Sequence, residues 1–290
     1  MEARTDLRKG ILCILLSALC YAAANTFVRL AGEIPAIQKT FFRSLVALAF
    51  SFLSLLRSRQ RLLPERRHLP LLILRSAVGM AGLLLSYYAI SRLALADATI
   101  LGKTAPFFTI LLSAVFLKES FTAKEGFLVL GAFIGALFVV KPSFENTLLT
   151  PALAGLLGGI MTGGAYAAVH ALGKRGVSGS QIVFFFMAFS VITAFPLMLP
   201  VYTPMAPRQL LFLLLVGLFS TGGLFTVAAA YRYAAPSQIS LYEYSEILLS
   251  EVLGFLVFSQ LPDLWSALGC LIILSMAVMR FRMEKNPEKQ

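Results

Sequence analysis

Ten apolar segments, five in each half of the chain, follow one another with only short connections. About 20 apolar residues in a helix cross the ~30 Å hydrocarbon core of a bilayer, and in lipid a helix satisfies its own backbone polar groups. Because five spans reverse the direction of the chain, the second half must insert in the opposite orientation to the first. The predicted helices cover residues 10–30, 36–56, 70–91, 95–117, 122–140, 152–172, 180–200, 208–231, 236–258 and 261–281.

The first span of each half carries the same local pattern. A shift of 145 positions places Tyr21 on Tyr166 and Asn25 on His170. The pattern predicts an all-α integral membrane protein whose ten transmembrane helices form two inverted five-helix repeats. We expect residues 1–143 to form the first repeat, 150–281 the second, inverted one, and 282–290 a cytoplasmic tail.

The distribution of basic residues predicts the orientation. Charged residues make up 13% of the chain, against roughly 25% in an ordinary soluble domain. Of the 25 lysines and arginines, seventeen fall at the span ends on the side of the N-terminus and five at the opposite ends. Lys and Arg accumulate in cytoplasmic loops, so both termini should be cytoplasmic, in a cell membrane. The basic residues are spread among loops, which argues against a nucleic-acid partner.

Acidic residues stand out in the ninth span, where a charge is costly. Glu243, Glu246 and Glu251 fall within an arc of about 140° on a helix that turns 100° per residue. Such carboxylates either serve substrate or proton binding or form a structural ion pair, and the sequence leaves both interpretations open. Glu246 is the deepest of the three, and we expect it to be the coupling residue.

Lys103, in the fourth span, is the natural counter-charge. A shift of 139 positions relates the fourth and ninth spans and carries Lys103 to Tyr242, next to Glu243. We therefore predict that Lys103 pairs with Glu243 or Glu246. Pro106, in the same span, should kink or locally open the helix. Of the other basic residues within spans, Arg75 is expected to extend to the inner membrane surface.

The first spans of the two halves each offer a small polar patch among alanines. Tyr21 and Asn25 are four residues apart, as are Tyr166 and His170, so each pair shares a helix face. These side chains either bind substrate from both halves or join neighbouring helices by hydrogen bonds.

Three stretches of the first half resemble a known family. They run from Tyr88 to Asp97 (YAISRLALAD), from Lys103 to Phe108 (KTAPFF) and from Phe116 to Glu119 (FLKE). With the ten spans, they resemble EamA-type members of the drug/metabolite transporter superfamily. The resemblance implies transport of a small metabolite through a central cavity lined by the first, third, fourth, sixth, eighth and ninth spans. The lining would include Tyr21, Asn25, Tyr88, Lys103, Tyr166, His170, Glu243 and Glu246.

We therefore expect a secondary transporter that moves a small polar metabolite by alternating access, either coupled to protons or by exchange. The acidic residues of the ninth span favour a cationic or zwitterionic substrate such as an amino acid or amine. A membrane-embedded enzyme and a channel are the alternatives. No catalytic set, nucleotide-binding motif or metal-binding spacing is visible, so no cofactor and no metal are expected. The expected partners are the substrate and the lipid bilayer, with the chain acting as a monomer or homodimer.

Overall fold

The structure is a computed structural model that describes residues 7–58, 65–117, 122–140, 148–233 and 240–285. Within these ranges the chain forms helices and short connections, with no β-strand. The α-helices (α) and 3-10 helices (η) are α1 (Leu7–Leu30), α2 (Ala36–Ser58), η1 (Arg66–His68), α3 (Leu69–Arg92), α4 (Leu95–Gly102), α5 (Ala105–Leu117), α6 (Ala123–Val140), α7 (Leu149–Lys174), α8 (Gly179–Met198), η2 (Leu199–Val201), α9 (Pro207–Tyr233), η3 (Ser240–Tyr244), α11 (Ser245–Phe258) and α12 (Leu264–Lys285).

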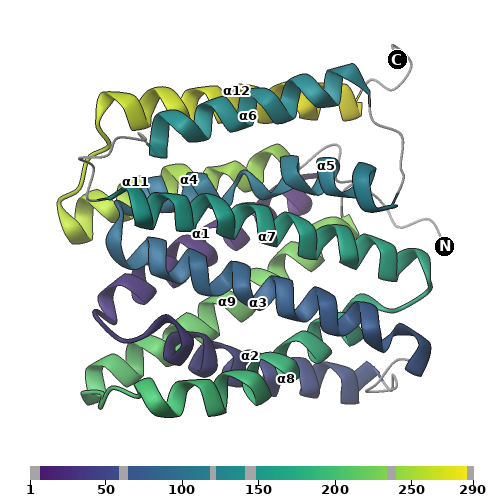
Figure 1. The fold of residues 1–290 in the computed structure, drawn as a ribbon, viewed down its shortest axis with the longest axis vertical. Helices are drawn as coiled ribbons and strands as arrows, with labels where there is room; N and C mark the ends of the chain where they lie inside the picture. The colour runs from purple at the N-terminus through teal and green to yellow at the C-terminus, as the bar shows by residue number, and fades with distance from the viewer. Residues whose placement is uncertain (1–6, 59–64, 118–121, 141–147, 234–239, 286–290) are drawn as a thin grey trace.

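The helices lie side by side with their long axes in similar directions (Figure 1). At one edge of the bundle α6 packs against α12, and at the opposite edge α2 packs against α8. Between these edges α1 packs on α9 and α3 on α7, while α5 contacts α7 and α11 contacts α1. The interior is therefore built by helices that are far apart in the sequence.

Helix ends follow local sequence signals. Two residues after the end of α1 and of α7 the backbone turns left-handed, and glycine occupies both positions: Gly32 with φ 73° and Gly176 with φ 79°. Glycine has no Cβ to oppose this conformation, which closes a helix C-terminus. Ser178 caps the N-terminus of α8: its hydroxyl accepts a hydrogen bond from the Gln181 N–H in a capping box.

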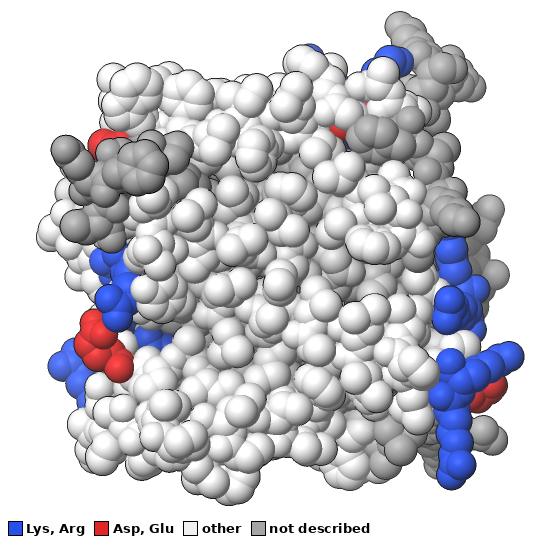
Figure 2. Space-filling model, in the orientation of Figure 1, with Lys and Arg blue, Asp and Glu red and all other residues white. Residues whose placement is uncertain are grey.

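One face of the bundle is apolar between the two ends of the helices. In the face shown, basic and acidic side chains gather at the two ends, and the broad area between them carries neither (Figure 2). Among the described residues, large apolar side chains are exposed, such as Phe116 at 75%, Ile192 at 71% and Leu256 at 70%. Among the described residues, eight helical stretches are long and apolar enough to cross a bilayer. The protein is thus a multi-pass membrane protein.

Two of the ten predicted spans are not among these eight. The span predicted over residues 122–140 corresponds to α6, which has 18 residues. The span predicted over 236–258 is represented by η3 and by α11, which has 14 residues, and it begins within residues 234–239, outside the described part. At 1.5 Å per residue α11 is about 21 Å long, shorter than the hydrocarbon core. For these two segments spanning stays a prediction.

Candidate functional site

The fourth predicted span is interrupted, and the interruption carries Lys103. Helix α4 ends at Gly102 and α5 begins at Ala105. Pro106 has no N–H to donate to the Gly102 carbonyl four residues earlier, and its ring crowds that carbonyl. The local opening expected from Pro106 is confirmed, and it lies just before the proline. Lys103 therefore occupies the C-cap of α4.

The ninth predicted span is also irregular at the position of its acidic residues. The chain runs as a 3-10 helix from Ser240 to Tyr244 and continues as the α-helix α11 from Ser245. Glu243 belongs to η3, whereas Glu246 lies in the first turn of α11. A carboxylate in the first helical turn is favoured by the helix dipole. Both acidic residues thus flank a change of helix type rather than lying in an uninterrupted helix.

Glu246 joins three helices of the bundle. Its Oε2 lies 2.7 Å from Nζ of Lys103, and its Oε1 accepts a hydrogen bond of 3.2 Å from Nδ2 of Asn25 on α1. The side chains of Lys103 and Glu246 are 19% and 9% exposed. The predicted pairing of Lys103 with Glu243 or Glu246 is confirmed for Glu246. Both carboxylate oxygens have a partner, which a buried charge requires to offset its loss of hydration.

Two predicted tyrosines lie around this ion pair. Tyr21 and Tyr166 are within electrostatic range of one another and of both Glu243 and Glu246. The Tyr21 ring rests on α9 at Gly223, where a Cβ would approach the ring carbons to 3.0 Å. Tyr166 on α7 is 51% exposed. The structure therefore brings together six of the eight predicted residues: Tyr21, Asn25, Lys103, Tyr166, Glu243 and Glu246.

The other two predicted residues lie toward helix ends. Tyr88 is one turn from the end of α3, where the guanidinium of Arg92 covers its ring at 5.1 Å. His170 is one turn from the end of α7 and is exposed. For both residues a role in substrate binding stays a prediction.

Three basic residues have environments that the sequence did not reveal. Arg75 does not extend to the membrane surface as expected: its side chain is buried, with the guanidinium 4.0 Å above the Phe186 ring. Arg43, on α2, is partly buried. Lys39 is 1% exposed, and its Nζ donates to the carbonyls of Val28 and Gly32 and to Oγ of Ser91. Lys39 thus closes the C-terminal end of α1, a role open to basic side chains there.

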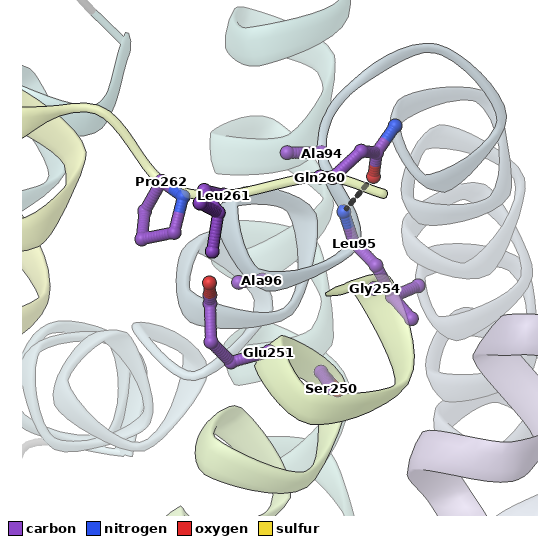
Figure 3. Close-up of a pocket in the computed structure, with 9 residues that line it drawn as sticks. All are labelled: Ala94, Leu95, Ala96, Ser250, Glu251, Gly254, Gln260, Leu261 and Pro262. Atoms are coloured by element: carbon purple, nitrogen blue, oxygen red, sulfur yellow. Dashed lines mark hydrogen bonds between the residues drawn. The ribbon is translucent and has the colours of Figure 1, made fainter. Parts of the chain in front are cut away.

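A small pocket lies at the far end of α11 from Glu246, and the Lys103–Glu246 pair does not line it. The Glu251 side chain points toward Ala96 and the connection at Leu261 (Figure 3). The Leu95 N–H and Gln260 Oε1 are 3.4 Å apart at its rim. Within the described residues, no three His, Cys, Asp or Glu side chains come together in a way that could hold a metal ion.

Comparisons with known proteins agree with this architecture. Residues 8–141 match the model of the EamA-like transporter family. The pseudopaline exporter CntI of Pseudomonas aeruginosa is 30% identical over 281 residues, which cover 96% of this chain and 98% of the exporter. Solute carrier family 35 member G1 of Mus musculus is 23% identical and covers 91% of this chain and 76% of its own length. A crystal structure of a protein 15% identical to this chain aligns over 97% of it with a TM-score of 0.65, which shows a shared fold.

Proposed function

This chain belongs to the EamA-like transporter family of membrane proteins, and we propose that it is a secondary transporter that moves a small polar metabolite by alternating access. In such carriers two inverted halves move against each other around a site near the bilayer midplane, where interrupted helices meet. The observation that carries the proposal is the buried Lys103–Glu246 pair, which joins two helix interruptions.

Helix packing supports two inverted halves, residues 1–143 and 150–281. If they are equivalent, α1 corresponds to α7, α3 to α9, and α4–α5 to η3–α11. The contact of α1 with α9 then corresponds to that of α7 with α3, and the contact of α5 with α7 to that of α11 with α1. The equivalent helices α2 and α8, and α6 and α12, contact each other. A two-fold axis in the membrane plane produces this exchange of contacts.

The ion pair suggests how substrate and conformation are coupled. Glu246 belongs to the second half and is bound by Lys103 and Asn25 of the first. A substrate group that takes over one of these contacts, or a proton that neutralises Glu246, removes an attraction between the halves. The halves can then rearrange and open the site to the other side of the membrane. In this mechanism Glu246 is the coupling residue, and Tyr21, Tyr166 and Glu243 border the substrate.

The orientation is part of the proposal: both termini face the cytoplasm across the cell membrane. It can be tested by impermeant thiol labelling in a variant whose native cysteines, Cys13, Cys20 and Cys270, are replaced. The Glu33 and Arg67 side chains are 90% and 71% exposed. A cysteine at Glu33 should label from outside and one at Arg67 should not. The reverse labelling pattern would show that the protein has the opposite orientation in the membrane.

Transport itself is tested by counterflow. A thermal-shift screen of metabolites on the purified full-length protein identifies a ligand, because a molecule that binds only the folded state raises its apparent stability. That ligand is then loaded into liposomes that contain the protein. In a carrier, unlabelled ligand inside the liposomes accelerates the uptake of labelled ligand from outside. In a channel it does not. Absence of such exchange would contradict the proposal.

The role of Glu246 is tested with a neutral variant of the same size. Glu246→Gln should retain exchange but lose accumulation driven by a pH gradient. Glu251→Gln makes the same change further along α11, away from the ion pair, and should behave as wild type. Normal pH-driven accumulation by Glu246→Gln would leave Glu246 with a structural role only. If wild type shows exchange but no pH-driven accumulation, the carrier works by exchange.

A further inference from the structure

Arg75 is buried within the membrane-spanning part of the bundle and has no anionic partner among the residues that the structure describes. Its side chain lies on α3 and is 8% exposed. The Arg75 guanidinium turns along α3 toward Gly79, and its Nη1 lies 3.7 Å from the position that a Cβ of residue 79 would occupy. The guanidinium also stacks on the ring of Phe186 of α8. Among the described residues, neither its Nε nor its Nη1 has a hydrogen-bond partner.

Arg43 of α2 presents a second unsatisfied guanidinium nearby. Its Nη1 is buried and likewise lacks a hydrogen-bond partner among the residues that the structure describes. Arg43 and Arg75 are within electrostatic range of each other. Arg43 is also in range of Tyr21, and Arg75 of Tyr166, the two tyrosines beside the ion pair. Both arginines therefore belong to the same polar cluster as Lys103 and Glu246.

Such an arrangement is unfavourable unless an anion completes it. A buried guanidinium with unpaired N–H groups loses hydration without compensation, and two neighbouring cations repel each other. Counted over the described residues, the cluster contains three cationic side chains, Arg43, Arg75 and Lys103, and two carboxylates, Glu243 and Glu246. One additional negative charge would balance it. The planar donor fork of arginine fits a carboxylate, which accepts two parallel hydrogen bonds.

We propose that Arg43 and Arg75 bind a carboxylate group of the transported molecule, so that the substrate is a carboxylic acid or a zwitterion. The inference rests on the proposed transport function and narrows its substrate class. Because Lys103 already neutralises Glu246, a purely cationic substrate has no free counter-charge in that pair. A single carboxylate fits the charge balance better than a phosphate, whose second charge would exceed it.

The test compares carboxylates with the corresponding amides, in which a neutral carboxamide group replaces the carboxylate, on the full-length protein in detergent. The probes are glycine, L-histidine, L-glutamate and acetate, each paired with its carboxamide at matched ionic strength. At least one carboxylate should raise the melting temperature of the wild type while its amide does not. Stabilisation by inorganic phosphate alone, equal stabilisation by acid and amide, or no stabilisation by any carboxylate would overturn the proposal.

Variants assign the effect to the two arginines. Arg43→Gln and Arg75→Gln each remove charge-assisted hydrogen bonds and should weaken binding of the stabilising carboxylate by about 10- to 100-fold. Arg208→Gln is the matched control, since Arg208 also covers a phenylalanine ring, 5.3 Å from Phe212, but is exposed at the start of α9. It should bind as wild type.

Further outcomes separate this inference from the transport function. If Arg75→Gln does not fold, Arg75→Lys keeps the charge and loses the planar fork, and it should still bind more weakly than wild type. Wild-type affinity in folded Arg43 and Arg75 variants would overturn the inference. Carboxylate binding that depends on both arginines, combined with no counterflow of that carboxylate, would retain the anion site and contradict the transport function instead.

Discussion

Replacing Lys103 with methionine should destabilise the protein strongly, because it leaves the Glu246 carboxylate buried. The 2.7 Å contact is lost, and among the described residues the Asn25 amide, at 3.2 Å, remains as the hydrogen-bond donor to a side chain that is 9% exposed. One neutral amide cannot replace a cation. Removing one member of a buried ion pair typically costs about 3–5 kcal/mol of folding free energy.

A double-mutant cycle isolates this interaction. Thermal unfolding in detergent would be measured for Lys103→Met, Glu246→Gln and the combined variant. In large domains, each kcal/mol of lost stability lowers the melting temperature by roughly 2–4 °C. Lys103→Met should therefore lower it by about 10 °C. The combined variant contains neither charge and should recover much of the loss.

The control for the cycle is an exposed ion pair. Arg92 Nη2 and Glu33 Oε2 are 3.7 Å apart, with side chains 50% and 90% exposed. Surface pairs contribute up to about 1 kcal/mol, so Arg92→Met should have a small effect. The reasoning is refuted if Lys103→Met costs no more than Arg92→Met, or if the two single effects simply add in the combined variant.

Two further predictions concern how the site is held in place. A Cβ at Gly159 of α7 would lie 2.5 Å from Thr104 Oγ1 at the helix interruption. Gly159→Ala should therefore lower the free energy of unfolding by about 1–3 kcal/mol. A Cβ at Gly173 would meet no described atom within 4 Å, so Gly173→Ala should be neutral or stabilising. Equal effects of the two substitutions would contradict the packing. Lys39→Met removes three hydrogen bonds at the end of α1 and should cost about 1–3 kcal/mol, with faster amide hydrogen exchange there. Unchanged stability and exchange would mean that the bonds are not needed.

The central contact could be predicted from the sequence because the proposed inversion of the two halves would place equivalent positions at similar depths in the membrane. The alignment of the fourth and ninth spans brings Lys103 next to Glu243 in register, and the cost of a charge in lipid requires a partner. Pro106 likewise predicts an interruption from local backbone chemistry alone. Helix propensity and apolar length account for most of the span positions. The Pro106 interruption and the span positions depend on the local sequence rather than on which helices pack against it.

The arginines could not be predicted in the same way. Distance from a helix end gives the depth of Arg75 but not the direction of its guanidinium, which depends on the Phe186 ring and on the space left by Gly79. Lys39 is a second case: its place near the start of α2 does not predict that its side chain turns back onto the carbonyls at the end of α1. Side-chain direction depends on tertiary neighbours that a single sequence does not identify.

Accessibility of the site from both sides of the membrane tests alternating access most directly. Tyr166 is half exposed and within electrostatic range of Lys103 and Glu246, so a cysteine in its place, with the native cysteines replaced, reports on the site. An impermeant thiol reagent should modify it from the external side in right-side-out vesicles and from the cytoplasmic side in inverted ones, and the transported ligand should change both rates. Modification from one side only, with and without ligand, would contradict the proposed mechanism.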